Sequence, residues 1–220
     1  MSEYAQVQTY ATCNQRTYSI VASHYRSVLE QLGCTDARVL QWLGSLHWPT
    51  SDDDGFGDIY VSSFMLAPEG KSGTNNPPAT LQCAGVAVSL YTNSAVPSTE
   101  DLPSWVGFDL LLETETLRES VTSQYKPEVG ALLWRIVQKL AAAFRELGAY
   151  LTDEWQESQP WRALTANMGD PWAFDLAIFP RSQAIHFSEV PAGFQGTVTE
   201  QGFGFAQANR WEELPWLDIQ

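Results

Sequence analysis

Carboxylates are the side chains of this sequence whose types and spacing could best support chemistry. The densest group follows Trp48 and consists of Asp52, Asp53, Asp54 and Asp58. Three consecutive carboxylates before a glycine suggest the oxygen ligands of a calcium loop, in which ligands fall at alternate positions and a glutamate closes the loop. Aligning Gly55 with the central glycine of such a loop places Thr50 first and Val61 last, so the spacing does not fit.

The segment 48–58, WPTSDDDGFGD, has the composition of a loop, because it combines proline and glycine with its aspartates. No basic residue lies between Arg38 and Lys71, so the negative field of this loop extends into solvent. Two interpretations follow, a solvated turn and an anionic docking patch for a basic partner. In the docking patch, Asp58 and the three consecutive aspartates attract the partner, and Trp48 anchors it.

Glu113 and Glu115 form another pair of carboxylates, at the end of an apolar run. Residues two apart in an extended strand point to the same side, so the pair could form an acid–base site or part of an acidic surface stripe. Other charged residues of this region are Glu100, Asp101, Glu119 and a single base, Arg118. We favour the stripe and assign Glu113 and Glu115 to partner binding.

The motifs of covalent catalysis and of phosphate binding do not occur in the sequence. GxSxG, GxxxxGK[ST] and GxGxxG are all missing. The histidines and cysteines are few and widely spaced, namely His24, His47, His186, Cys13, Cys34 and Cys83. We therefore expect no catalytic residue, no cofactor and no metal site, and we interpret the cysteines as buried thiols of a reducing compartment.

Composition and charge narrow the classes of partner. The chain has 220 residues, of which 44% are apolar and 12% aromatic, which is enough for a packed core. No segment resembles a domain linker, so we expect one domain over residues 1–220. The 26 acidic and 12 basic residues give a net charge of -14, which disfavours nucleic acid and favours a basic protein as partner.

The start of the chain predicts a cytoplasmic protein. The segment MSEYAQVQTY lacks both the basic start and the apolar core of a signal peptide. No apolar run approaches the length needed to span a membrane. We therefore expect no contact with a membrane.

The elements that must position these residues are helices in the first half and strands toward the end. Apolar residues at steps of three and four predict helices over residues 14–32, after Asp36, and over residues 127–147. Strand patterns occur at residues 4–10, 59–65, 81–91, 105–114, 173–179, 184–190, 196–201 and 203–207. Helices are grouped and do not alternate regularly with strands, so we expect an α+β fold with a mixed or mainly antiparallel sheet and C-terminal antiparallel strands.

This layout resembles that of bacterial immunity proteins. The features that carry the resemblance are the early helical pair, the central strands, the long amphipathic helix and the run WRALTANMGDPWAFDLAIFP followed by VPAGFQGTVTEQ. The chain is most similar to the immunity protein 52 family of polymorphic-toxin systems, in which a late Trp-containing segment precedes a Gly-Thr turn, here Gly196 and Thr197. The resemblance implies a toxin partner with a restriction-endonuclease-like nuclease domain, delivered by a type VI secretion system or a related route.

From charge and resemblance together, we expect an immunity protein that is not an enzyme and that blocks the cleft of a cognate basic toxin. Two other functions stay open. The first is a small enzyme with a carboxylate site, which an ordered cleft with strongly perturbed carboxylates would indicate. The second is a type VI adaptor or chaperone, which would bind an effector without neutralising it.

Overall fold

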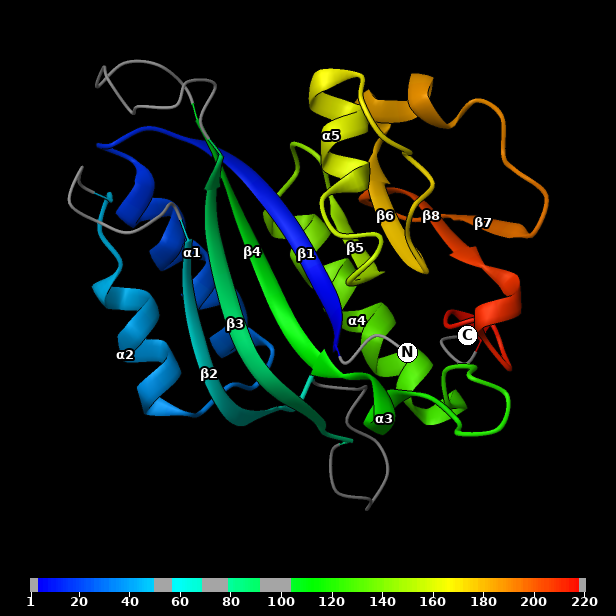
Figure 1. The fold of residues 1–220 in the computed structure, drawn as a ribbon, viewed down its shortest axis with the longest axis horizontal. Helices are drawn as coiled ribbons and strands as arrows, with labels where there is room; N and C mark the ends of the chain where they lie inside the picture. Colours follow the sequence, from blue (N-terminus) through cyan, green and yellow to red (C-terminus); the bar gives the residue numbers. More distant parts are fainter. Residues whose placement is uncertain (1–3, 50–56, 69–78, 92–103, 218–220) are drawn as a thin grey trace.

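The structure, a computed structural model, describes residues 4–49, 57–68, 79–91 and 104–217 of the chain. Within these ranges, eight strands form one antiparallel sheet in the order β2-β3-β4-β1-β5-β6-β8-β7 (Figure 1). The strands are β1 (Tyr4–Cys13), β2 (Gly57–Leu66), β3 (Leu81–Tyr91), β4 (Ser104–Glu113), β5 (Ala149–Asp153), β6 (Leu176–Pro180), β7 (Phe194–Val198) and β8 (Gly202–Gln207). The expected α+β fold with antiparallel C-terminal strands is confirmed.

Strand β1 lies near the middle of the sheet, although the sequence predicts only a short strand over residues 4–10. Each of its 10 residues pairs with β4, and residues 5–9 also pair with β5. Ala5 and Val7 join the core beneath the helices, whereas Gln6 and Gln8 are buried on the opposite face. The sequence suggests a strand with one exposed face, because the residues on this second face are polar, yet both faces are buried.

Helices α1 (Tyr18–Gln31), α2 (Ala37–Ser45) and α4 (Pro127–Ala143) cover one face of the sheet, which we call the inner face (Figure 1). Helix α2 packs against β2, and α4 packs against β1, β5 and β6. The predicted apolar side of α4 is buried, with Leu133, Ile136, Val137, Leu140 and Phe144 in the core. The helix begins at Pro127 as expected and ends at Ala143, four residues earlier than predicted.

The opposite, outer face is covered over only part of its width. A second aromatic cluster packs there beneath α5 (Gln159–Ala166) and the 3-10 helix η1 (Arg181–Phe187). Its buried members are Tyr10, Leu147, Tyr150, Phe174, Ala177, Phe179, Phe187 and Phe205. Among the described residues, β2 contributes nothing to this cluster and β3 contributes only Tyr91. The outer face of β2 therefore lacks the aromatic layer that covers β5, β6 and β8.

The strand predicted over residues 184–190 is wrong, because most of that segment lies in η1. Ile185 and Phe187 would share one face of a strand, yet Ile185 is exposed and Phe187 is buried. The ring of Phe187 stacks on Phe179, with 3.8 Å between centroids, and the helical turns of η1 bring it there. Helix α5 and strand β5 are further elements that the sequence patterns did not identify.

The last described segment closes the structure next to the start of α4. The ring of Trp211 stacks on Tyr125 with 4.3 Å between centroids, and η2 (Ala208–Arg210) precedes it. Trp211 and Leu214 both pack on the main core. Across the described ranges, we find no helix whose length and hydropathy would let it cross a membrane.

Candidate functional site

The structure describes only the two ends of the loop predicted to bind a partner. Three members of that predicted site lie outside the described residues, namely Asp52, Asp53 and Asp54. Trp48 is half-buried and packs edge-on against Tyr18, with 5.8 Å between ring centroids. Burial, together with the charge of the exposed Asp58, raises the pKa of Tyr18 to about 12. Trp48 and Asp58 thus both approach Tyr18, and Trp48 also fixes its end of the loop to the core.

The prediction that Glu113 and Glu115 point to one side of an extended strand is wrong. Glu113 is the last residue of β4, whereas Glu115 lies in the one-turn helix α3 (Thr114–Leu117). The chain turns there because Leu117 is buried in the core, and the Oγ1 atom of Thr116 donates a 2.8 Å hydrogen bond to the carbonyl oxygen of Glu113. Both carboxylates are exposed, which fits surface charges better than an enclosed acid–base pair.

The outer face of β2 carries a group of exposed apolar side chains, which we call the outer strip. Alternate residues of β2 point to the helices of the inner face, namely Tyr60, Phe64 and Leu66. The residues between them point outward, and the outer strip consists of Ile59, Val61 and Met65. Ile59 is 60% exposed and Val61 is 70% exposed. Apolar side chains grouped in this way mark surfaces that contact other proteins.

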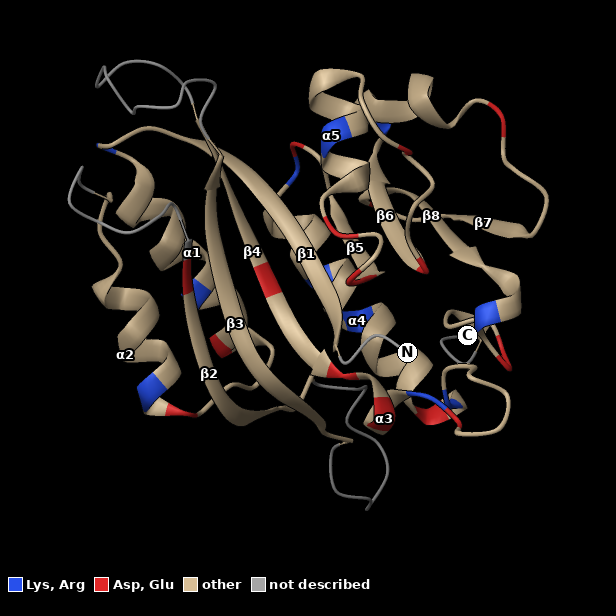
Figure 2. Ribbon diagram, in the orientation of Figure 1, with Lys and Arg blue, Asp and Glu red and all other residues tan. Residues whose placement is uncertain are grey.

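A buried carboxyl group lies on the same face, two strands away. Asp109 is in the middle of β4, where Figure 2 shows an acidic segment, and its neighbours across the sheet are Ala87 of β3 and Gln8 of β1. Burial raises the pKa of Asp109 to about 7, against the hydrogen bond from Gln8, which lowers it, and with the charge of Glu157, which adds to the rise. The carboxyl group therefore titrates near neutral pH.

Asp109 belongs to a chain of buried polar side chains that crosses three strands. The Nε2 atom of Gln8 donates to Oδ1 of Asp109 at 2.9 Å and lies 3.2 Å from Oε1 of Gln6. The Oγ1 atom of Thr152 on β5 donates to Oε1 of Gln8 at 3.0 Å. Because the oxygen of the Gln8 amide accepts from Thr152, its nitrogen must face Asp109. This series of hydrogen bonds thus fixes the orientation of the Gln8 amide that donates to the carboxyl group.

Aromatic and hydroxyl side chains close this network from the side of α5. The ring of Trp161 lies 4.4 Å from Tyr91 and 5.7 Å from Tyr10, measured between centroids. The Oγ atom of Ser158 lies 3.4 Å from the hydroxyl of Tyr91. Ser158 has φ 59°, in the left-handed region, where a non-glycine residue costs on the order of 1 kcal/mol. Ser158 thus contacts Tyr91, and burial together with the charge of Asp109 raises the pKa of that tyrosine.

The turn between β5 and α5 presents a tryptophan to solvent. Trp155 is 85% exposed, the largest exposed fraction among the described aromatic side chains. The Oδ1 atom of Asp153 accepts the backbone N–H groups of Trp155 at 3.0 Å and of Gln156 at 3.1 Å, which fixes the turn. Glu154 and Glu157 flank Trp155 in the chain. The turn therefore holds an exposed aromatic ring among acidic residues.

The sequence carried weak signals for Asp109 and Trp155, and neither was identified from it. Asp109 interrupts the apolar run WVGFDLLLET, and an acidic residue inside a buried strand needs a partner or a shifted pKa. Trp155 lies in TDEWQES, where it has no apolar neighbour to pack with in a helix or strand pattern. In both cases the signal is one residue that does not match its surroundings.

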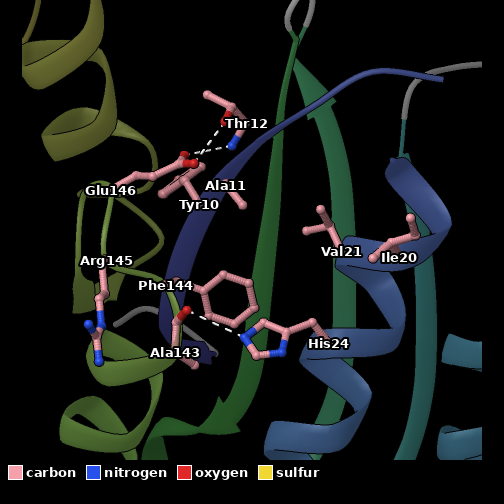
Figure 3. Close-up of a pocket in the computed structure, with 10 residues that line it drawn as sticks. All are labelled: Tyr10, Ala11, Thr12, Ile20, Val21, His24, Ala143, Phe144, Arg145 and Glu146. Carbon is pink, nitrogen blue, oxygen red and sulfur yellow. Dashed lines mark hydrogen bonds between the residues drawn. The ribbon is translucent and has the colours of Figure 1, made fainter. Parts of the chain in front are cut away.

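A pocket of about 270 Å³ opens between α1 and the end of α4 (Figure 3). Its polar groups are engaged within the protein: both oxygens of Glu146 accept from Thr12, at 2.7 Å from the backbone N–H and 2.8 Å from Oγ1. The Nε2 atom of His24 lies 3.4 Å from the carbonyl oxygen of Ala143. The rest of the lining is mostly apolar, so the pocket suits an apolar group better than a reacting substrate.

A buried ion cluster joins the C-terminal segment to the sheet. The Oδ2 atom of Asp175 accepts from Nη2 of Arg118 at 2.7 Å and from the hydroxyl of Tyr125 at 2.8 Å, and Oδ1 lies 3.2 Å from Nε of Arg210. Burial raises the pKa of Asp175, and the charges of Arg210 and Arg118 oppose the rise. The paired charges fit a structural role, although Oδ1 of Asp175 and Nε of Arg118 are buried without a hydrogen bond.

The described residues provide no metal site, and their cysteines are buried thiols. Within the described ranges, no three His, Cys, Asp or Glu side chains are grouped so that they could hold a metal ion. Cys13, Cys34 and Cys83 are buried and unbridged, so their interpretation as buried thiols is confirmed.

No protein-family model, no curated protein and no solved structure matches this chain.

Proposed function

We propose that this chain binds a cognate toxin and neutralises it by covering the active or substrate-binding cleft of the toxin, as an immunity protein does. The observation that carries the proposal is the outer strip, in which Ile59 and Val61 are 60% and 70% exposed on the outermost strand of the sheet. Burying such side chains against another protein releases about 25 cal/mol per Å² of apolar surface. The strip therefore favours a protein partner.

Charge around the outer strip favours a basic partner. Glu113 ends β4, Glu157 is close enough to Asp109 to raise its pKa, and Asp58 lies on β2 but points to the face opposite the outer strip. An apolar centre with a charged rim is the common anatomy of a protein interface. With a net charge of -14, the chain attracts a basic protein over several ångströms, while the apolar contact slows its release.

We propose Trp155 as a second contact, because its turn leads to the outer face of the sheet. The turn that carries it continues into Ser158, which contacts Tyr91 on the outer face. Tryptophan is enriched among the residues that dominate binding energy, and a ring held on a fixed turn loses little entropy when it binds. The proposed interface therefore includes the outer strip and Trp155, together with the predicted charges of the loop before β2.

A nuclease is the kind of toxin that this surface suits best. A nuclease cleft must be basic in order to hold a nucleic acid backbone. An acidic protein that carries few basic residues can occupy that cleft in place of the nucleic acid, and its own charge repels nucleic acid. The restriction-endonuclease-like class and the delivery by type VI secretion come from the resemblance to immunity proteins, and they are part of the proposal.

A pull-down with the product of the adjacent gene, followed by a toxicity rescue assay, tests this function. The proposal expects a complex, and it expects cells that express the chain to survive the toxin. Binding without rescue would identify an adaptor or chaperone instead. If the chain neither binds that gene product nor rescues the cells, the proposal is rejected for that pair.

A carboxylate enzyme is a second candidate, and Asp109 is the observation that favours it. A carboxyl group with a pKa of about 7 suits acid–base catalysis near neutral pH, but Asp109 is 3% exposed and does not line the pocket described above. Assays of the purified chain on ester, phosphoester and glycoside substrates test this candidate. An activity that Asp109→Asn abolishes, at an unchanged melting temperature, would establish it.

A further inference from the structure

Strand β2 is an edge strand of the sheet, so the peptide groups on its outer edge have no neighbouring strand to pair with. Within the described residues, β2 pairs only with β3. Apart from the ladder with β3, no backbone hydrogen bond between described residues joins residues 57–66 to another segment. The nearest such bond runs from the N–H of Ala67, just past the strand, to the carbonyl oxygen of Leu32 at 3.0 Å. Every second peptide group of β2 therefore points toward the open edge.

Most of the features that protect natural sheet edges are missing from β2. Such edges are usually short or carry lysine, proline or a bulge. The sequence of β2, GDIYVSSFML, has 10 residues and contains neither lysine, arginine nor proline. A register shift between Val61 and Phe64 marks one bulge. Residues 57–61, before this bulge, form a regular stretch that carries the apolar Ile59 and Val61.

We infer that residues 57–61 of β2 accept an added β-strand from a basic partner. The inference rests on the proposed function and specifies how the partner binds. Backbone hydrogen bonds along β2 supply affinity, and alternate side chains supply selectivity. Ile59 and Val61 flank the incoming strand on the outer face, and Asp58 flanks it on the other face. The matching strand alternates apolar and basic residues.

A second copy of this chain is a poorer occupant of the same edge. Each copy carries a net charge of -14, so two copies repel one another before their edges meet. A basic strand avoids this repulsion.

Hydrogen exchange with a synthetic peptide that alternates lysine and isoleucine tests the inference. We expect the peptide to slow exchange about tenfold at backbone amides of residues 57–61 and to leave β7, the opposite edge, unchanged. A control peptide of the same charge with prolines in place of some isoleucines cannot form a ladder and should give no protection. No protection of β2, or equal protection by the control peptide, would overturn the inference.

Proline substitutions separate pairing at the edge from charge attraction. Asp58 and Ile59 are consecutive and exposed, so one of their N–H groups points to β3 and the other points to the open edge. Only one of the variants Asp58→Pro and Ile59→Pro removes the outward N–H, and that variant should keep the wild-type melting temperature. The same variant should no longer be protected by the peptide. Asp58→Asn controls for charge and should keep most of that protection. A folded proline variant with full protection would contradict strand addition.

Two further outcomes distinguish this inference from the proposed function. A chain that binds and neutralises the product of the adjacent gene while the amides of β2 stay unprotected would keep the function and reject strand addition. Protection of β2 that rises with the concentration of the chain alone would identify self-pairing and would also reject a basic partner strand.

Discussion

The Nε2 atom of Gln8 donates a 2.9 Å hydrogen bond to Oδ1 of Asp109, across the pair formed by β1 and β4. This contact attaches an ionisable group to a chain of polar side chains that ends at Thr152 on β5. One donor is not enough to offset the loss of water around a buried carboxylate, so the pKa of Asp109 stays high at about 7. The outer face therefore contains a group that changes charge within the physiological range.

Asp109 should make the protein less stable as pH rises from about 4 to about 7. Its pKa is about 7 in the folded chain and near 3.8 in the unfolded chain, so the unfolded chain releases the proton first. The free energy of unfolding then falls with pH by up to about 1.4 kcal/mol per pH unit within this window. Asp109→Asn should remove this dependence, so wild type should lose stability relative to the variant between pH 5 and pH 8.

Urea unfolding of both proteins at the two pH values measures that difference. The exposed Asp58 serves as a control, because Asp58→Asn should keep the wild-type dependence on pH. Equal pH dependence in wild type and in Asp109→Asn would show that the carboxyl group is ionised at low pH in the folded chain.

Leu140→Ala should lower the free energy of unfolding by about 2 to 5 kcal/mol, because Leu140 is fully buried between α4 and the sheet. Val121→Ala is the comparison, since Val121 is 92% exposed and its loss should leave stability almost unchanged. Urea unfolding measures both. A variant at Leu140 that is as stable as wild type would contradict the packing of α4.

The parts of the fold that the sequence predicted well are those in which apolar residues follow one period. The run over residues 81–91 gives β3 with both ends correct, and α4 begins at the predicted Pro127. The strand predicted over residues 4–10 is three residues shorter than β1, and its Gln6 and Gln8 fill buried positions with polar groups that the sequence alone would place on an exposed face. Such positions are recognisable only when the partner strands that satisfy the polar groups are known.

Changing Asp52, Asp53, Asp54 and Asp58 to asparagine should slow association with the toxin more than it speeds dissociation. The reason is that a change of net charge acts mainly on the rate of encounter, and the loss should shrink as salt is added. A matched control removes the same charge elsewhere, by changing the exposed Glu189, Glu200, Glu212 and Glu213 to glutamine. Stopped-flow binding at two salt concentrations measures the association rates of both variants. Equal losses in the two variants would show that the four aspartates act only through the net charge of the protein.

Trp155→Ala should speed dissociation about tenfold or more, equal to about 1.4 kcal/mol, without changing the melting temperature. The ring is 85% exposed, so its removal costs the folded chain little. Trp48→Ala should behave differently and lower the melting temperature, because Trp48 packs on Tyr18. Dissociation rates and thermal melts of the two variants test this contrast, and unchanged dissociation of Trp155→Ala would remove that residue from the interface.

The candidate site was less predictable than the fold, for a physical reason. Trp48, Asp58, Glu113 and Glu115 were chosen from local charge and composition. The outer strip depends on which face of β2 the helices cover, and α2 packs on the opposite face, where Trp42 contacts Tyr60. Exposure of Ile59 and Val61 is therefore a property of the packed sheet.

The affinity of Val61→Glu for the product of the adjacent gene, compared with that of Val198→Glu, tests the central claim most directly. Val61 and Val198 are 70% and 68% exposed and lie on β2 and β7, the two edge strands of the sheet. The added carboxylate attracts a basic partner in both variants, so a loss of affinity can only come from the contact itself. We expect Val61→Glu to weaken binding by about tenfold or more and Val198→Glu to leave it within about twofold of wild type. Equal affinities of the two variants would contradict the assignment of the outer strip as the surface that binds the toxin.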